Sequence, residues 1–547
     1  MTQPHDVQSR DGILKIDLNI RSYRSHDGSV RYCYLSAGVP SPTLRLHPGD
    51  LLELRLKNEL TDLDSVPAAM TGMSMTPARP GADPHRRGAE RAGRSDPCIN
   101  GAMTALSTNL HFHGLTVPAR CHEDEVLKTS IQPEDPPFEY RFRIPKNEPP
   151  GLYWYHPHIH GFSSRQVIGG ASGALIIEGI ERAVPQVAGL PERVLVVRDQ
   201  DLLNPDAPPS KSEPVVPRNL IDRDGDSANN GTGFGRPAKD LSINFVPVPW
   251  PDYAPARIQM KPGARELWRV LNASAITYLD LALIYGRARQ QLGLVGIDGV
   301  PLGTSGHMNE ITWVEHIGVP PGARVEFIIN GPGESVPAMF VTRSVDTGQG
   351  GENDPNRGLA SIVATPEVTE PPALPAVQAP LPAPTLAWLG DVQPVRVRKL
   401  YFSEKLDNPN DPNSASSFFI TVAGQTPKPF DPIEGPDIVT QQGDVEDWII
   451  ENRSTELHAF HIHQLHFMLV EWNGAPVNEP FLRDTVNVPY YNGRMLEYPS
   501  VRVRMDFRDP DSIGTFVYHC HLLEHEDAGM MGTIRVDPRP GAVPMQP

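Results

Sequence analysis

One spacing is shared by three segments of the chain: LHPGDLLELRLKNEL (46–60), MKPGARELWRVLNAS (260–274) and TQQGDVEDWIIENRS (440–454). In each segment a Gly precedes an Asn by nine positions, and apolar and polar residues roughly alternate between them. Alternation with a period of two predicts a β-strand, with the Gly in a turn and the Asn at the end of the strand. The pairs are Gly49 and Asn58, Gly263 and Asn272, and Gly443 and Asn452. Three matches at domain-scale spacing predict a triplicated β-domain.

Composition agrees with this interpretation. The 547 residues are too many for one ordinary core, and 59 Pro and 46 Gly disfavour long helices. The net charge of −17 argues against nucleic acid or an anionic membrane surface as partner. No apolar run approaches the roughly 18 residues of a membrane span. We therefore expect an all-β protein, with no membrane span, that acts as a monomer.

The repeats also suggest domain boundaries. The first domain is predicted at 1–182, with an insertion at about 62–97 that is rich in Pro, Gly, Ala and Arg. The second is predicted at 190–365 and the third at 391–547. Between them, residues 366–390 are predicted to form a linker, because the Pro-rich stretch at 365–385 is typical of an extended segment.

A second repeat relates the outer units. GLYWYHPH (151–158) matches GTFVYHCH (514–521), with the Gly, the Tyr and both His identical. The middle unit has AMFVTR (338–343) at the comparable place, without His. This pattern predicts that the outer units carry the chemistry and that the middle unit serves as a spacer and docking surface.

Histidines occur in four His-x-His pairs. On a strand, residues i and i+2 point to one face, about 6.6 Å apart, so each pair offers two imidazoles to one cavity. The first and third units contribute two pairs each, which predicts a multinuclear metal site at their interface. The pairs are His111 and His113, His156 and His158, His461 and His463, and His519 and His521.

A second metal site is predicted on the other face of the last strand. Cys520 lies between His519 and His521, so its side chain faces the opposite way. His458, His525 and Met530 are the remaining candidate ligands, with Met531 as the alternative to Met530. Two His, one Cys and a weak axial Met are typical of a blue-copper electron-transfer site. Zinc, the competing metal, has no redox chemistry and does not explain this grouping.

The motifs HFHG (111–114), YHPH (155–158), HAFHIH (458–463) and HCHLLEHEDAGMM (519–531) resemble those of the three-domain multicopper oxidases. This group includes laccases, bilirubin oxidases and bacterial cuprous oxidases. The resemblance implies three cupredoxin-like Greek-key β-sandwich domains and four copper ions. It implies a type 1 copper at His458, Cys520, His525 and Met530, and a type 2 copper at His111 and His461. It assigns one type 3 ion to His113, His156 and His521, and the other to His158, His463 and His519.

The resemblance also implies a reaction. Four one-electron oxidations of a small reducing substrate, here phenols or aromatic amines in a laccase-like enzyme, are coupled to reduction of O2 to two water molecules. A cuprous-ion or bilirubin oxidase is the alternative enzyme, and a copper-sequestering or scaffold protein of this fold is the alternative that is not an enzyme. Members of the family are commonly periplasmic or secreted, whereas the polar start MTQPHDVQSRDG lacks the apolar core of a signal peptide.

Two acids are predicted to relay protons to the multinuclear site. Glu526, directly after His525, resembles the relay acid of bacterial members. For the second acid, the usual position nine residues after the HFHG motif's second His holds His122, followed by Glu123 and Asp124; we favour Asp124.

Several other residues carry weaker predictions. His160 and His466 are expected to pack near the ligands rather than bind metal. Met70, Met73 and Met75 are interpreted as chance Met in a solvated loop, with cuprous-ion binding as the alternative. Cys98 and Cys121 flank the first motif and are candidates for a disulfide, and Cys33 is expected unpaired in a strand.

Overall fold

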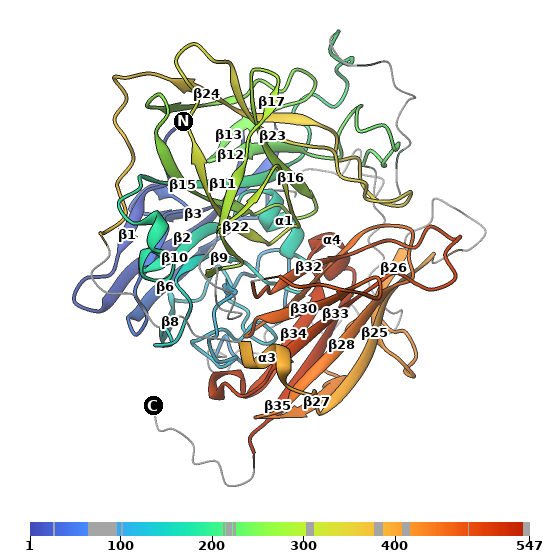
Figure 1. Ribbon diagram of the computed structural model, residues 1–547. Coiled ribbons are helices and arrows are strands. Elements are labelled where there is room, and N and C mark those ends of the chain that lie inside the picture. The colour runs from blue at the N-terminus through green and yellow to red at the C-terminus, as the bar shows by residue number, and fades with distance from the viewer. Residues whose placement is uncertain are drawn as a thin grey trace.

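The computed structural model describes residues 1–25, 28–63, 96–99, 102–211, 214, 221, 226–301, 311–376, 387–406, 408, 416–479 and 481–539. Within these ranges the strands form six sheets, and the helices are short. Figure 1 shows three β-bodies, coloured blue to cyan, green to yellow, and orange to red along the chain. Among the described residues no helix has the length and apolarity to span a membrane. The predicted all-β class, with three cupredoxin-like sandwiches, is confirmed.

The first sandwich is built from the first ten strands. One sheet has the order β1 (Asp6–Gln8), β5 (Thr43–Leu46), β10 (Gly173–Ile177), β9 (Gly151–His156), β7 (His111–His113). The other has the order β4 (Val39–Pro40), β3 (Val30–Ser36), β2 (Ile13–Arg24), β6 (Leu51–Glu59), β8 (Phe138–Arg143). Helices α1 (Ser163–Ile168) and α2 (Ile180–Ala183) follow β9 and β10, and the 3-10 turn η1 (Pro185–Val187) leads to the second sandwich.

The second sandwich contains fourteen strands. One sheet runs β13 (Val246–Val248), β12 (Asp240–Ile243), β11 (Glu192–Gln200), β15 (Arg265–Asn272), β22 (Arg324–Asn330), β18 (Leu292–Ile297), β19 (Val300–Pro301), with β20 (Thr312–Val314) beside β18. The other runs β14 (Ala256–Met260), β24 (Arg357–Ala364), β23 (Ala338–Thr342), β16 (Leu279–Tyr285), β17 (Ala288–Arg289), with β21 (Ile317–Val319) beside β16.

The third sandwich contains the last eleven strands. One sheet runs β26 (Ser416–Val422), β25 (Arg396–Leu406), β28 (Val445–Asn452), β33 (Ser500–Asp506), β30 (Phe467–Trp472), β31 (Ala475–Pro476). The other runs β27 (Ile438–Gln441), β35 (Met531–Asp537), β34 (Gly514–Cys520), β29 (His458–Ile462), β32 (Thr485–Val488). A 3-10 turn, η2 (Pro510–Ser512), precedes β34, and helix α4 (Leu523–Asp527) follows it.

The Gly-to-Asn repeat occupies the same place in all three sandwiches. Its strands are β6, β15 and β28, and each pairs in parallel with one neighbour (β2, β11, β25) and antiparallel with the other (β8, β22, β33). The three glycines have φ between 66° and 95°, a left-handed conformation that suits Gly. The second repeat is equally regular, because β9, β23 and β34 are each antiparallel to the strand that follows them in their sheet.

The repeated asparagines are fully buried and join loops to the strand end. The Nδ2 of Asn452 donates to the backbone O of Glu456 at 2.8 Å and of Val488 at 3.1 Å, and its Oδ1 accepts from Ser454 N at 2.9 Å. Asn58 and Asn272 likewise donate to two carbonyls each and accept from the amide two residues later. An Asn here satisfies three backbone groups that the strand cannot pair.

The sandwiches pack against one another through apolar contacts. Leu152, Trp154, Ala174 and Ile176 of the first form a buried cluster with Val194, Val196, Leu271 and Ala273 of the second. Val167 of α1, Ala275 and Ile276 of the second sandwich and Leu523 of α4 form another, so a point where all three meet lies beside the last histidine motif. Figure 1 shows α1 and α4 near this junction.

A short helix, α3 (Ala387–Asp391), stands at the junction between the predicted linker and the third sandwich. It follows the Pro-rich stretch, and the sequence permits a helix here because no proline occurs between Pro384 and Pro394. Residues 377–386 lie outside the described part.

Candidate metal centres

The eight paired histidines converge between the first and third sandwiches; we call them the histidine cluster. They are carried by β7, β9, β29 and β34 or by the residues directly after these strands, and none is more than 2% exposed. The ring of His111 stacks on that of His463 with centroids 3.7 Å apart, and His113 stacks on His461 at 3.9 Å. Side chains from the two sandwiches therefore interleave, as predicted for an interface site.

The ring nitrogens of the cluster face one another. The Nε2 of His519 lies 3.4 Å from the Nε2 of His158 and 3.4 Å from the Nε2 of His463. Nitrogens of His111, His113 and His156 form a second group in which all lie within 4.8 Å, and His111, His461 and His463 form a third. Spacings of this size place several nitrogen donors around the same small volume.

The outer nitrogens are held by the protein, which fixes the direction of the inner ones. The Nδ1 of His111 lies 3.0 Å from Asp124 Oδ2, and the Nε2 of His113 lies 3.1 Å from Asp484 Oδ1. Backbone oxygens hold three more: Pro157 O with His156 Nδ1, Asp484 O with His461 Nδ1, and Cys520 O with His519 Nδ1, each at 2.9 Å.

The inner nitrogens fit a metal cluster. Six of the eight cluster histidines have a ring nitrogen for which no hydrogen-bond partner is found among the described residues: His111 Nε2, His113 Nδ1, His156 Nε2, His461 Nε2, His463 Nδ1 and both nitrogens of His521. In His111, His113, His156 and His461 this nitrogen is the inner one, opposite the nitrogen that the protein holds. A buried polar atom without a partner costs about 1–3 kcal/mol, so the inner nitrogens are expected to be satisfied by a bound group. Burial, together with the neighbouring imidazoles, lowers the pKa of His111 and His521 well below its usual value. Neutral imidazole is the form that binds metals such as copper.

A second centre lies on the opposite face of β34. The Sγ of Cys520 is 3.5 Å from His458 Nδ1 and 3.9 Å from His525 Nδ1, and the two Nδ1 atoms are 3.3 Å apart. All three residues are buried, and burial raises the pKa of the Cys520 thiol to about 12. A thiolate at this place therefore needs a cation beside it, which agrees with a metal-binding role.

Met530 and Met531 face different surroundings. Met530 is fully buried in the core cluster that contains Cys520, its amide donates to His525 O, and its carbonyl accepts from Cys520 N. Met531, the next residue, packs with Val126 and Val517 instead. Of the two candidates, Met530 is the one on the side of the second centre.

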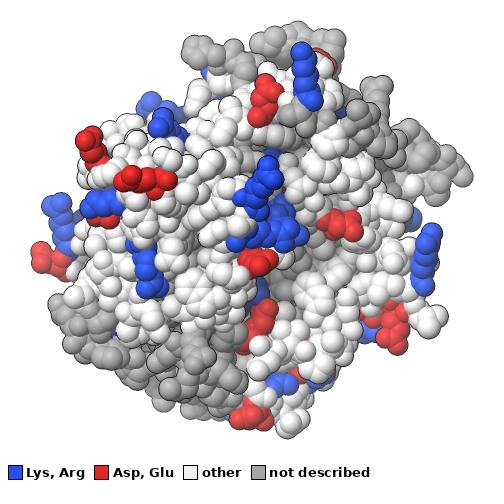
Figure 2. All heavy atoms as spheres, turned by 45° about the horizontal axis from the view of Figure 1, so that its top comes forward, with Lys and Arg blue, Asp and Glu red and all other residues white. Residues whose placement is uncertain are grey.

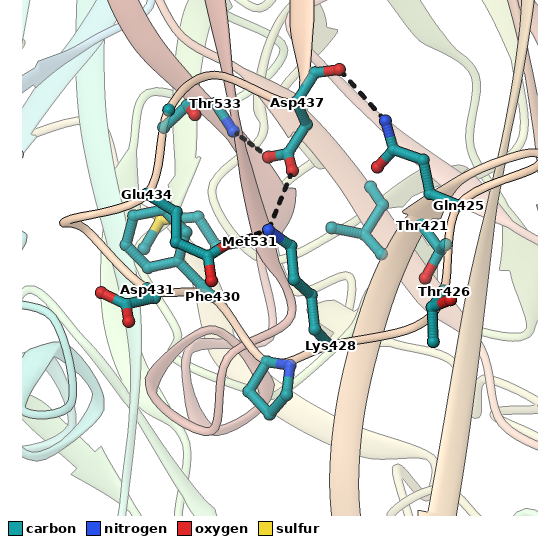
Figure 3. Close-up of a pocket in the computed structure, with 13 residues that line it drawn as sticks. Thr421, Gln425, Thr426, Lys428, Phe430, Asp431, Glu434, Asp437, Met531 and Thr533 are labelled. Carbon is teal, nitrogen blue, oxygen red and sulfur yellow. Dashed lines mark hydrogen bonds and ion pairs between the residues drawn. The ribbon is translucent and has the colours of Figure 1, made fainter.

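Met531 also lines a small pocket beside β26 and β35 (Figure 3). Lys428 pairs there with Glu434 and with Asp437, whose Oδ2 accepts from Thr533 N at 3.0 Å. Phe430, in the same loop, donates its amide to Gly529 O, directly before Met530. The thirteen lining residues include no His or Cys, so this pocket offers no copper-type donor set; its ion pairs anchor the loop that covers Gly529.

The outer edge of the second centre holds residues that the sequence did not single out. The Nε2 of His458 bonds Ser454 Oγ at 2.8 Å and lies 3.4 Å from Glu404 Oε1, and the Nε2 of His525 lies 3.2 Å from Glu456 Oε1. The ring of Phe418, partly exposed, stacks on His525 with centroids 4.2 Å apart. No spacing in the sequence links Glu404 and Phe418 to the histidine motifs.

The two predicted relay acids both touch the histidine cluster. Asp124 is buried, accepts from Phe112 N at 2.9 Å and Gln464 Nε2 at 2.7 Å, and faces His111 Nδ1. Glu526 accepts from Ser163 Oγ at 3.1 Å and lies 3.3 Å from His519 Nδ1. Burial raises the pKa of both carboxyls well above the usual value, so both tend to hold a proton. His122, the alternative position, is exposed and stacks on Phe138.

The remaining predicted residues lie around the site. Cys98 and Cys121 form a disulfide, and Cys33 is a buried free thiol in β3. His160 packs against Phe430, and the Nε2 of His466 lies 2.8 Å from Asp298 O, so both contact groups outside the inner cavity. Met70, Met73 and Met75 fall outside the described residues.

On the face drawn in Figure 2, acidic and basic side chains are interspersed among a larger uncharged area.

Comparison with known proteins shows which family the chain resembles. Two family models, each described as multicopper oxidase, match residues 98–182 and 402–540. The curated "Multicopper oxidase mco" of Staphylococcus aureus is 22% identical over 437 residues, covering 79% of this chain and 77% of that protein. A laccase of Haloferax volcanii is 23% identical, covering 80% and 68%.

The solved structures share the fold. A multicopper oxidase from Campylobacter jejuni, described as a metallo-oxidase, matches with a TM-score of 0.64 and 24% identity, over 98% of this chain and 95% of its own. The family models and the curated relatives thus relate the chain to the multicopper oxidases, whose members are copper-dependent oxidoreductases that use small-molecule substrates and O2.

Proposed function

We propose that the chain is a laccase-like oxidase that couples four one-electron oxidations of phenols or aromatic amines to reduction of O2 to two water molecules. The observation that carries the proposal is the position of Cys520. Its sulfur belongs to the second centre. One peptide bond joins Cys520 to His519 and another joins it to His521, and both histidines belong to the histidine cluster. The chain thus provides a short covalent path between a site suited to single electrons and a site suited to several metal ions.

The donor sets support four copper ions. His458, Cys520, His525 and Met530 would hold the type 1 ion. His111 and His461 would hold the type 2 ion, with His113, His156 and His521 on one type 3 ion and His158, His463 and His519 on the other. The 3.4 Å approaches among the Nε2 atoms of His158, His463 and His519 agree with their sharing one ion. When bound, copper would supply the one-electron chemistry and the reduction of O2.

The protein's own contribution includes holding protons. Formation of water consumes protons inside a cavity whose histidines are at most 2% exposed. Glu526 and Asp124 each keep a carboxyl oxygen within 3.3 Å of an outer nitrogen of a cluster histidine. Because burial keeps the pKa of both acids high, each is suited to carry a proton toward the cavity.

The substrate class rests on the edge of the second centre. The partly exposed ring of Phe418, stacked at an interplanar angle of 16° on His525, offers an aromatic surface next to the residue through which electrons would enter. A flat aromatic substrate can pack against such a ring. This contact supports phenols and aromatic amines as the substrate class.

A second candidate substrate is the cuprous ion. The carboxyl groups of Glu404 and Glu456 lie 3.4 and 3.2 Å from the outer nitrogens of His458 and His525, and Glu404 is partly exposed. The carboxylate of Glu404 at this edge favours the approach of a cation.

Visible absorption and oxygen uptake test the proposal. The copper-loaded protein is expected to be intensely blue and to consume O2 with a phenol. Cys520→Ser is expected to abolish both, whereas Cys33→Ser, which removes the other buried free thiol, is expected to retain both. A colourless wild type with full copper content, or turnover that survives Cys520→Ser, would contradict the proposal. Comparing kcat/KM for a phenol and for cuprous ion then separates the two substrates.

A further inference from the structure

One side chain of the middle sandwich reaches the histidine cluster. Arg324, the first residue of β22, is fully buried. Its Nη1 donates to Asp484 Oδ1 at 2.8 Å, and its Nη2 lies 2.7 Å from Asp484 Oδ2, a two-point ion pair with the third sandwich. Its Nε donates to Leu152 O of the first sandwich at 3.1 Å, and Nη2 also donates to Asp298 O at 2.9 Å. A single guanidinium thus bonds groups from all three sandwiches.

Asp484, the partner of Arg324, also contacts two histidines of the cluster. Its Oδ1 lies 3.1 Å from the Nε2 of His113, and its backbone oxygen lies 2.9 Å from the Nδ1 of His461. These are the outer nitrogens of two rings that stack on each other at 3.9 Å. The inner nitrogens, His113 Nδ1 and His461 Nε2, have no partner among the described residues. The orientation of Asp484 therefore decides which nitrogen each ring presents to the cavity.

Two glycines make room for this arrangement. A Cβ on Gly114, which follows His113 and has a φ of +90°, would lie 2.2 Å from Arg324 Nη2 and 2.8 Å from Asp484 Oδ2. A Cβ on Gly322, two residues before Arg324 and with a φ of +84°, would lie 2.7 Å from the ring of His521. Real Cβ atoms do not approach so closely, so the middle-sandwich loop packs directly against the cluster. Gly114 of the HFHG motif is required here because a side chain at this position would collide with the guanidinium of Arg324.

We infer that Arg324 is a positioning residue for the histidine cluster. By fixing the carboxylate of Asp484, it holds His113 with Nδ1 directed at the metals, and it also anchors the residue whose backbone oxygen holds His461 Nδ1. The middle sandwich, predicted to be a spacer and docking surface, thereby supplies part of the multinuclear site. This inference rests on the proposed assignment of the cluster to copper.

The variants are chosen to separate positioning from general stabilisation. Arg324→Gln removes both the charge and the planar guanidinium that can bind two oxygens at once. Arg324→Lys keeps the charge but not the guanidinium. Asp484→Asn keeps the shape and alters the contact with His113. Arg269→Gln is the matched control, because Arg269 is also a fully buried arginine of the middle sandwich, paired with Glu192 and Glu326 and outside the cluster.

The readouts are copper per chain, the type 2 electron paramagnetic resonance signal, the visible absorption of the type 1 site, unfolding of the copper-free protein, and reoxidation of the reduced enzyme by O2. Arg324→Gln is expected to keep the visible absorption, to weaken or lose the type 2 signal, and to slow reoxidation about 10- to 100-fold, the usual effect of losing a group that orients a ligand. Arg324→Lys is expected to recover part of this loss. Arg269→Gln is expected to lower stability and to leave the type 2 signal and reoxidation unchanged.

The outcomes are distinguishable. If Arg324→Gln unfolds more easily yet keeps the type 2 signal and the reoxidation rate of the wild type, the positioning role is wrong. If Arg324→Gln does not fold, Asp484→Asn decides: a wild-type signal and rate in that variant would also overturn the inference. A wild type that binds no copper or consumes no O2 would instead contradict the proposed function.

Discussion

The Nε2 atoms of His158 and His519 face each other at 3.4 Å although the two residues are 361 positions apart in the chain. One ring belongs to the first sandwich and the other to the third, so neither sandwich holds this pair of donors alone. The pair exists because β9 and β34 occupy equivalent places in repeated sheets that meet at an interface. Docking of the sandwiches therefore brings together the donors of the proposed multinuclear site.

Glu526→Gln is expected to slow reduction of O2 by about 10²- to 10⁴-fold, the range for loss of a positioned proton donor. The amide keeps the size of the side chain and the bond from Ser163 but has no acidic proton to give. Stopped-flow reduction of the blue site by a phenol should be unaffected, while reoxidation by O2 should slow. The neighbouring Glu524→Gln is the control, because Glu524 pairs with Lys239 rather than with a cluster histidine. Equal reoxidation rates in wild type and Glu526→Gln would rule out the relay.

Phe418→Ala is expected to raise KM for phenols and to leave KM for cuprous ion unchanged, because the stacked ring offers area to an aromatic substrate and none to an ion. Loss of one aromatic contact, about 0.5–1.5 kcal/mol, corresponds to a change of roughly 2- to 12-fold. Glu404→Gln should show the reverse preference if cations approach past this partly exposed acid. Steady-state kinetics with both substrates check this, and a parallel change for both substrates in Phe418→Ala would show that the ring acts on His525 alone.

Removal of the disulfide between Cys98 and Cys121 is expected to lower the free energy of unfolding by about 2–4 kcal/mol, because the bond closes a loop of 23 residues in the unfolded chain. Asp124 lies three residues after Cys121, so copper binding at His111 should weaken as well. Urea unfolding of the copper-free double Ser variant, with Cys33→Ser as control, measures the first effect, and copper titration measures the second. A variant as stable as the control would show that the disulfide does not brace this loop.

Glu148 predicts a pH dependence of stability. Burial raises its pKa to about 8 in the folded protein, and its Oε2 accepts from Thr116 N at 3.2 Å. Between the usual carboxyl pKa and about 8, the folded state holds a proton that the unfolded state has lost. The free energy of unfolding should therefore fall as pH rises through this window, by up to about 1.4 kcal/mol per pH unit.

Glu148→Gln should remove that part of the slope, since the amide does not titrate. Urea unfolding of the copper-free protein at several pH values across the window measures the slope, and the exposed Glu139→Gln serves as control. An unchanged slope in Glu148→Gln would show that this carboxyl is ionised in the folded protein.

Much of the site could be predicted from the sequence because strand periodicity and ligand chemistry are both local. Alternation along a strand places His519 and His521 on one face and Cys520 on the other, and the structure has this division. The Gly-to-Asn repeat predicted three related β-units, and the three asparagines hold equivalent loops.

The residues that were not predicted make contacts between elements that are far apart in the sequence. Arg324 and Asp484 meet only because three sandwiches dock at one point, and Phe418 reaches His525 from a strand about 100 residues earlier. None of these residues stands at a characteristic spacing from a ligand motif. Helix α3, after the Pro-rich stretch, was not predicted either, because a segment of five residues is too short to show a helical period.

In the proposed function, the Cys520 site and the histidine cluster act together to reduce O2 to water. This is tested by the stoichiometry of the copper-loaded enzyme under limiting O2, with an oxygen electrode for O2 and optical detection of the oxidised phenol. We expect four one-electron equivalents of phenol to be oxidised per O2, with no hydrogen peroxide released. Two equivalents per O2, with peroxide in matching amount, would contradict it.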